Sequence, residues 1–140
     1  MLKKMGQRLK NERGLTLIEL LAVVVILGII AAIAIPSIGG LINNSRADAH
    51  IANAQQMVNA ARLAMTAEEI AAGGTIDLDT LVDNGYLEQV DNPSGGDYDG
   101  EESLVTIVAG GDHTVTLSNG TNVYLQNANP DEITREDVDM

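Results

Sequence analysis

The chain has 140 residues, enough for one domain of ordinary size, with 20 acidic and eight basic side chains. It has no cysteine, which excludes a disulfide framework, thiol catalysis and cysteine-ligated zinc. It also lacks a Gly-rich phosphate loop, a Gly-x-Ser-x-Gly elbow and a His-Glu-x-x-His motif. We therefore expect a protein that is not an enzyme.

The charges are divided unevenly along the chain. Five of the eight basic residues lie in the first thirteen positions: Lys3, Lys4, Arg8, Lys10 and Arg13. From Leu15 onward, three arginines stand against nineteen acidic residues. A basic start before an apolar run is typical of a membrane segment whose N-terminus stays in the cytoplasm. The acidic remainder would repel nucleic acid, so we expect no direct binding to it.

The apolar run covers residues 20–35, and no charge follows it before Arg46. Together with residues 15–18 and the neutral residues after Pro36, it is long enough for a membrane-spanning helix of about 20 residues. We expect this helix over residues 15–40.

Residues 41–72 have the pattern of an amphipathic helix. Apolar side chains recur at spacings of three and four, at Ala47, Ile51, Ala54, Val58, Ala61 and Met65. Gly73-Gly74 would end this helix, because glycine readily takes the left-handed conformation beyond a helix end. Pro36 and Gly39-Gly40 predict bends further towards the N-terminus.

Residues 73–127 predict a small head. We expect a short helix or turn over 77–87, a loop rich in Gly and Asp over 91–102, and three strands near 104–108, 113–117 and 121–126. A three-stranded sheet is too small to stand alone, so the apolar stripe of the amphipathic helix should cover it.

The turn between the last two strands decides their pairing. A three-residue loop of Ser118, Asn119 and Gly120 would set Val115 opposite Val123 and His113 opposite Leu125, so that apolar side chains share one face. Gly120 would then be the left-handed bulge residue.

The C-terminal tail and the two histidines carry no predicted function. The tail over residues 128–140 is acidic and should be loose, apart from a turn of helix after Asp131. The two histidines lie far apart in sequence, so we interpret His50 as an exposed helix residue and His113 as a strand residue, with no metal or catalytic role.

Glu19 breaks the rule for a membrane segment. A carboxylate at the start of an apolar run costs a few kcal/mol on insertion scales. On its position alone, Glu19 either stays wet at the headgroup boundary or has a partner inside the membrane.

The residues around Glu19 resemble the type IV pilin and pseudopilin family. The resemblance covers Lys10 to Ile38 and rests on the run Gly14-Leu15-Thr16-Leu17-Ile18-Glu19-Leu20-Leu21. It implies that prepilin peptidase removes the leader 1–14 by cleaving after Gly14 on the cytoplasmic side, and that Leu15, where the family most often has Phe, is then N-methylated. The family's fold is α+β, with a long N-terminal helix packed on a small antiparallel sheet.

The resemblance extends to the helix and to the head. Pro36 matches the proline that bends the family's helices, and Gly28 lies in the stretch that loosens in assembled filaments. Residues 78–87 are similar to a segment of competence and secretion pseudopilins, including competence-type subunits of Gram-positive bacteria.

The chemistry of a cleaved chain agrees with this resemblance. Cleavage after Gly14 creates an α-amine one helical turn from Glu19. In a stack of parallel apolar helices, the amine of one subunit can meet Glu19 of the next, and breaking such a desolvated pair would cost several kcal/mol. The pair would therefore fix the axial register between subunits.

These features lead to one expectation and several alternatives. The expected protein is a filament subunit that is stored in the membrane as a single-pass precursor, polymerises into a cell-surface homo-oligomer, and works with prepilin peptidase, an assembly ATPase, a platform protein and minor pilins. The alternatives are a pseudopilin of a secretion or competence system, a membrane-anchored binding module, and a secretory protein cleaved near Ala32-Ile33-Ala34.

The loop after residue 91 could also gather oxygen ligands. Four carboxylates, those of Asp97, Asp99, Glu101 and Glu102, could surround a calcium ion. Their spacing is not that of an EF-hand, and a solvated acidic loop is the alternative. We expect no other cofactor.

Overall fold

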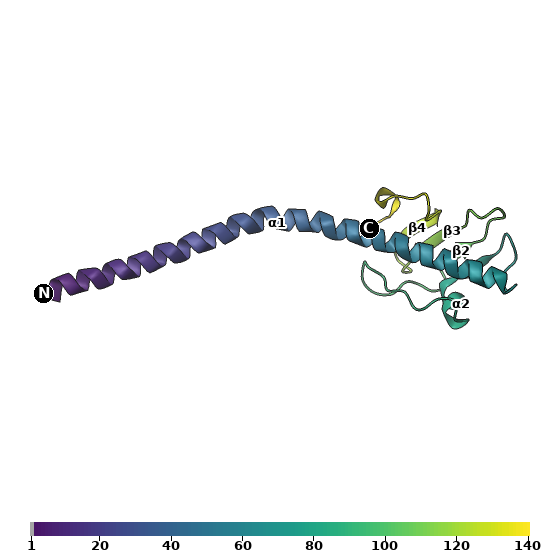
Figure 1. Ribbon diagram of the computed structural model, residues 1–140, viewed down its shortest axis with the longest axis horizontal. Helices are drawn as coiled ribbons and strands as arrows, with labels where there is room; N and C mark the ends of the chain where they lie inside the picture. The colour runs from purple at the N-terminus through teal and green to yellow at the C-terminus, as the bar shows by residue number, and fades with distance from the viewer. Residues whose placement is uncertain (1) are drawn as a thin grey trace. The chain divides into compact units, whose positions relative to one another are not determined.

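The computed structural model describes the backbone of residues 2–140 and the side chains of residues 12–140 (Figure 1). The elements in chain order are α1 (Leu2–Thr66), β1 (Thr75–Asp77), α2 (Leu78–Asp83), β2 (Leu104–Thr106), β3 (Thr114–Ser118), β4 (Val123–Ala128) and the 3-10 helix η1 (Arg135–Asp137). Four of the leader's basic side chains, those of Lys3, Lys4, Arg8 and Lys10, lie outside the described ones. The predicted α+β architecture of a long N-terminal helix and a small antiparallel sheet is confirmed.

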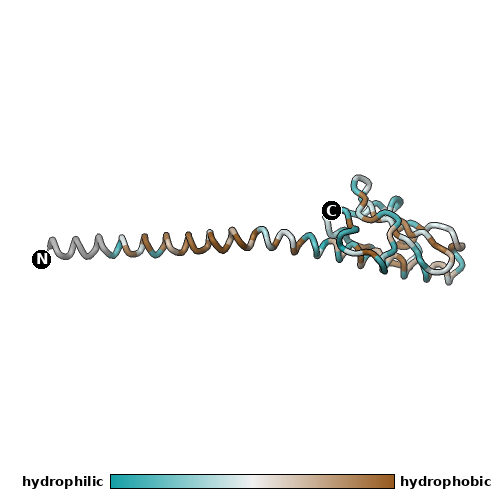
Figure 2. The backbone as a smooth tube through the Cα atoms, turned by 90° about the horizontal axis from the view of Figure 1, so that it is seen from above, coloured by the Kyte–Doolittle hydropathy of each residue, from teal (hydrophilic) through white to brown (hydrophobic). Residues whose placement is uncertain are grey.

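The chain divides into two compact units, Met1–Leu41 and Ile42–Met140. In the first unit, α1 remains helical through Pro36 and Gly39-Gly40. From Leu15 to Ile38 its large apolar side chains are exposed, and Figure 2 shows these residues mainly in the hydrophobic colour. The bends proposed at Gly28 and Pro36 stay predictions.

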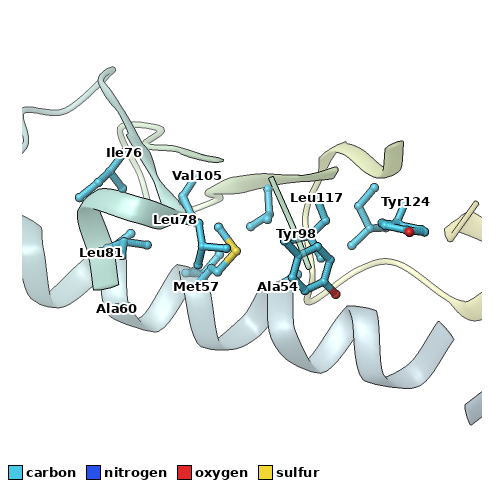
Figure 3. Packing of buried hydrophobic residues seen from close by; sticks show 14 of the residues in the cluster. Ala54, Met57, Ala60, Ile76, Leu78, Leu81, Tyr98, Val105, Leu117 and Tyr124 are labelled. Carbon is cyan, nitrogen blue, oxygen red and sulfur yellow. The ribbon is translucent and has the colours of Figure 1, made fainter. Parts of the chain in front are cut away.

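In the second unit, the remaining half of α1 covers the sheet as predicted. Its buried face is lined mainly by small side chains: Ala47, Ala54, Ala60, Ala61 and Ala64, with the larger Met57 and Val58. Figure 3 shows Leu78, Leu81 and Leu117 between this face and the sheet with α2. The core therefore lies between α1 on one side and the sheet with α2 on the other.

Helix α1 ends at Thr66, so the prediction that it continues to Ala72 is wrong. Glu68 takes a left-handed conformation (φ 61°), which glycine would usually supply. The amide of Glu68 donates to the carbonyl of Met65, and the amide of Glu69 donates to that of Ala64 (3.0 and 3.1 Å). These two bonds form a Schellman cap, which satisfies the last carbonyls and stops the helix before Gly73-Gly74.

The sheet has four antiparallel strands in the order β1-β2-β3-β4, so the prediction of three strands was incomplete. The missed strand β1 pairs Ile76 with Val105 of β2. Beyond it, Gly73 and Gly74 exchange backbone hydrogen bonds with Ile107 (3.0 and 2.8 Å). Gly73-Gly74 therefore belongs to the edge of the sheet and does not act as a helix stop.

The predicted pairing of β3 with β4 is wrong. Leu117 lies opposite Leu125 and Val115 lies opposite Ala128, with irregularities between the paired positions. The turn is longer than predicted because Asn119 closes it with its backbone and its side chain, which accepts the amides of Thr121 and Asn122 (3.0 and 2.7 Å). Gly120 has the predicted left-handed conformation (φ 83°).

The C-terminal tail is ordered against the head, so the prediction of a loose tail is wrong. Val138 is buried in the core, and the amide of Asp139 donates to the carbonyl of Tyr124 (2.9 Å). The Arg135 guanidinium in η1 donates two hydrogen bonds to the Asp48 carboxylate of α1 (2.6 and 2.7 Å). These bonds lower the pKa of Asp48 and raise that of Arg135.

Candidate functional site

Gly14 and Leu15, the predicted cleavage pair, both lie within helix α1. A Cβ added at Gly14 would meet no atom within 4 Å, so the surface around this residue is open. Glycine in a helix interior is less stable than alanine by about 1 kcal/mol. The Thr16 hydroxyl donates to the Glu12 carbonyl across the predicted cleavage point (3.0 Å), a back-bond that tends to weaken and bend helices. The helix is therefore locally weak at the bond that a peptidase would have to expose.

Glu19 lies one turn beyond Leu15, on the same face of the helix. Both side chains are exposed, and among the side chains described from Glu12 onward none forms an ion pair with Glu19. The residues around Glu19 are apolar and exposed: Leu17, Ile18, Leu20, Leu21, Val23 and Val24. The structure therefore presents one carboxylate on a long apolar surface.

The apolar half of α1 is long and apolar enough to cross a membrane, and its most apolar stretch is not buried against the rest of the chain. Exposing such a surface to water would be unfavourable and would favour aggregation, whereas a bilayer or a bundle of similar helices would cover it. A carboxylate on that surface is costly unless it stays at the interface or is paired.

The four carboxylates of the acidic loop do not converge. Asp99 accepts the backbone amides of Glu101 and Glu102 (3.1 and 2.9 Å), and Glu102 accepts the Ser118 hydroxyl (2.7 Å). Asp97 instead lies beside α2. Across the described residues, no group of three or more acidic or histidine side chains could hold a metal ion.

A buried polar cluster surrounds His50, whose interpretation as an exposed helix residue is wrong. The His50 side chain is fully buried. Its Nδ1 lies 2.6 Å from the Tyr98 hydroxyl and its Nε2 lies 2.9 Å from the Ser94 hydroxyl, while its ring stacks on Tyr124 at 4.2 Å between centroids. The cluster joins α1 to the loop after α2 and to β4.

The hydrogen bonds of the cluster favour a neutral imidazole. Asn53 donates its side-chain amide to the Tyr98 oxygen (3.1 Å), which leaves the phenol proton for Nδ1 of His50. Nε2 then carries the ring proton and donates it to Ser94. Burial lowers the pKa of His50 to about 4 and raises that of Tyr98 to about 12. The cluster is therefore uncharged at neutral pH.

The sequence contained a signal for this cluster. His50 lies three residues after Ala47 and four before Ala54, within the spacing of the buried stripe. His113 is also buried, immediately before β3, and its Nδ1 accepts the amide of Val108 (3.2 Å). Both histidines have hydrogen-bond partners inside the second unit, and neither lies near Gly14 or Glu19 in sequence.

The start of the chain matches the model of a known protein family. The family model described as the prokaryotic N-terminal methylation motif matches residues 9–35. No curated protein and no solved structure matches the chain. The matched residues contain Gly14, Leu15 and Glu19, and they begin the apolar half of α1. The chain therefore carries the N-terminal methylation signature of type IV prepilins, on an α+β fold like that of a pilin.

Proposed function

We propose that this chain is the structural subunit of a type IV pilus or pilus-like filament. It is inserted through the apolar half of α1, trimmed after Gly14, methylated at Leu15 and polymerised through the same helix. The observation that carries the proposal is the single carboxylate, Glu19, on the exposed apolar surface inside the methylation motif. A membrane anchor would need only the apolar surface. A polymer also needs an interaction that fixes the axial position of each subunit relative to its neighbour.

The basic residues support this role for Glu19. All three lysines of the chain lie before Gly14, and the arginines that remain after cleavage are Arg46, Arg62 and Arg135. All three arginines lie in the second unit. After cleavage, the α-amine of Leu15 is therefore the cation within the apolar segment that can pair with Glu19 of a neighbouring subunit. Pairing the amine of one subunit with Glu19 of the next removes an unpaired charge from both apolar surfaces.

The rest of the assembly follows from the same helix. The apolar side chains around Glu19 supply attraction between subunits without fixing an axial position, and the ion pair selects one. Prepilin peptidase, an assembly ATPase, a platform protein and minor pilins are the partners that this role requires. The filament would lie at the cell surface, and its precursor would lie in the membrane.

A pseudopilin of a secretion or competence system is the second candidate. Residues 78–87 resemble a pseudopilin segment, and they contain α2, whose N-cap Asp77 accepts the Thr80 amide (2.7 Å). Such a subunit would use Gly14, Leu15 and Glu19 in the same way but would form a short filament. Microscopy of sheared surface material separates the two, since a pseudopilin would give short filaments only on overexpression.

The test replaces Glu19 while following two quantities. Glu19→Ala should enter the membrane at least as well as the parent chain, because it removes a charge from an apolar helix. It should nevertheless give no filaments, because the neighbour's amine would be buried without a partner. Glu19→Gln should also assemble poorly. Mature subunit in the membrane is measured by blot, and sheared filaments are counted by microscopy.

Val24→Ala is the matched control, because it changes an exposed residue of the same apolar segment, beyond the predicted cleavage point, without changing its charge, and it should assemble normally. Normal filaments from Glu19→Ala would contradict the role of Glu19 in register. They would favour the alternative interpretation, in which Glu19 stays hydrated at the headgroup boundary. An absence of filaments from the parent chain would leave a membrane-anchored module in place of the filament subunit.

A further inference from the structure

The second unit is strongly acidic and has few cations to offset repulsion. Residues 42–140 contain eighteen acidic side chains and three arginines. Arg135 is committed to Asp48. Packing copies of such a unit side by side brings like charges together, which is unfavourable unless a cation lies at the contact.

The two other arginines differ in their surroundings. Arg62 donates a long hydrogen bond to Asn59 on its own helix (3.5 Å). Arg46 is exposed and, among the side chains described from Glu12 onward, has no hydrogen-bond or ion-pair partner. Arg46 is therefore the cation of the second unit that is most available to a neighbouring molecule.

A groove of about 240 Å³ lies between α2 and the loop that follows it. Its exposed lining residues include three acidic ones, Asp79, Asp83 and Asp97, and its half-buried lining residues are Val82 and Val90. None of the three carboxylates accepts a hydrogen bond from a described side chain or amide, in contrast to Asp99 and Glu102 of the neighbouring loop. The groove thus combines apolar surface with unengaged negative charge.

We infer that this groove receives Arg46 of the neighbouring subunit in the filament. An arginine fits both parts of the groove, because its methylene stem packs on apolar side chains while its guanidinium binds carboxylates through paired hydrogen bonds. The partner is thus a second copy of this chain. The inference rests on the proposed filament and adds a contact between heads to the contact between apolar helices.

The absence of cysteine allows a direct test in the full chain. Two variants, Arg46→Cys and Asp97→Cys, are co-expressed as separate chains, and sheared filaments are treated with a short bismaleimide crosslinker, because an arginine paired with a carboxylate holds the two Cα atoms further apart than a disulfide allows. A crosslink between chains that needs both variants should appear as a dimer on a denaturing gel. Each variant expressed alone is the first control. Arg46→Cys with Asp112→Cys, whose cysteine would lie in the loop before β3, is the second.

Two results overturn the inference, and they are distinguishable. Filaments that form normally but give no more dimer from the Arg46 and Asp97 pair than from the controls would remove the head contact while leaving the filament intact. A parent chain that forms no filaments would remove the proposed function itself.

Charge-changing variants give an independent measurement. Arg46→Glu should reduce the filament count at least several-fold while the amount of mature subunit in the membrane stays unchanged. The double variant Arg46→Asp with Asp97→Arg should recover part of the filament count. An unchanged count from Arg46→Glu would also overturn the inference.

Discussion

The Nδ1 atom of His50 lies 2.6 Å from the hydroxyl oxygen of Tyr98, two residues that are 48 positions apart in the chain. Together with the Ser94 contact, this pair ties the loop after α2 to the amphipathic half of α1. Since burial lowers the pKa of His50 to about 4, protonation of the ring opposes this arrangement. The contact is therefore sensitive to acid.

The stability of the head should fall as the pH is lowered from about 6.5 to about 4. His50 has a lower pKa in the folded head than in the unfolded chain, so the unfolded state binds more protons in this window. The contribution is fully present above the ordinary pKa of 6.5, and its complete loss would amount to roughly 3 kcal/mol. Urea unfolding of the full chain in detergent, followed by tyrosine fluorescence, measures it.

Two variants isolate the histidine in that experiment. His50→Gln should be less stable at neutral pH and should lose most of the slope between pH 5 and 6.5. His113→Gln, which changes the other buried histidine, should retain the slope. An undiminished slope in His50→Gln would assign the acid sensitivity to the carboxylates.

Val138→Ala should destabilise the head by about 2 kcal/mol, because the valine is buried and its truncation leaves a cavity. Val123→Ala is the matched control, since Val123 lies in β4 but is 42% exposed, and its effect should stay within about 0.5 kcal/mol. Both are measured by urea unfolding. Equal effects from the two variants would mean that the tail does not complete the core.

The mature subunit should begin at Leu15 and carry one additional methyl group. Intact-mass analysis of the chain extracted from filaments or membranes checks both modifications at once. Replacing Gly14 with a bulky residue should leave the full-length precursor in the membrane. A mature terminus at Ile35 would instead indicate a secretory signal peptide.

Calcium should have little effect on the melting temperature of the head. Asp99 and Glu102 use carboxylate oxygens in hydrogen bonds within the chain, and Asp97 lies apart from them beside α2. A ligand that binds the folded state raises the melting temperature with its concentration, as mass action requires. Melting is compared with chelator and with millimolar calcium. A rise that grows with calcium concentration would support the calcium site predicted from the loop.

The sequence predicted the parts of this protein that depend on pattern over many residues. The apolar run, the stripe from Ala47 to Met65 and the short helix α2 follow from periodicity, which local physics fixes strongly. The methylation motif was predicted for a different reason, the resemblance of the run from Gly14 to Leu21 to the type IV pilin family. Glu19 stands out in the sequence as a lone charge in an apolar segment, and its role in register stays a prediction.

The features that were missed depend on contacts between distant residues. Glu68 ends α1 in a conformation that its residue type does not favour, and β1 has only three residues, so neither carries a local signal. The pairing of Leu117 with Leu125 depends on an irregularity that alternation does not reveal. His50 lay within the buried stripe, but a polar residue there was assigned to the surface because its partners Ser94 and Tyr98 are not sequence neighbours.

The second unit closes its core with residues that follow all of its strands in the chain. Arg135 reaches back 87 positions to Asp48, and Val138 fills a place in the core. If the second unit crosses a membrane behind the apolar half of α1, residues 135–138 therefore have to cross before its core can be completed. Contacts of such large sequence separation form slowly. Folding would thus be a late event on the far side of the membrane, which keeps the chain extended and exportable until it has passed through.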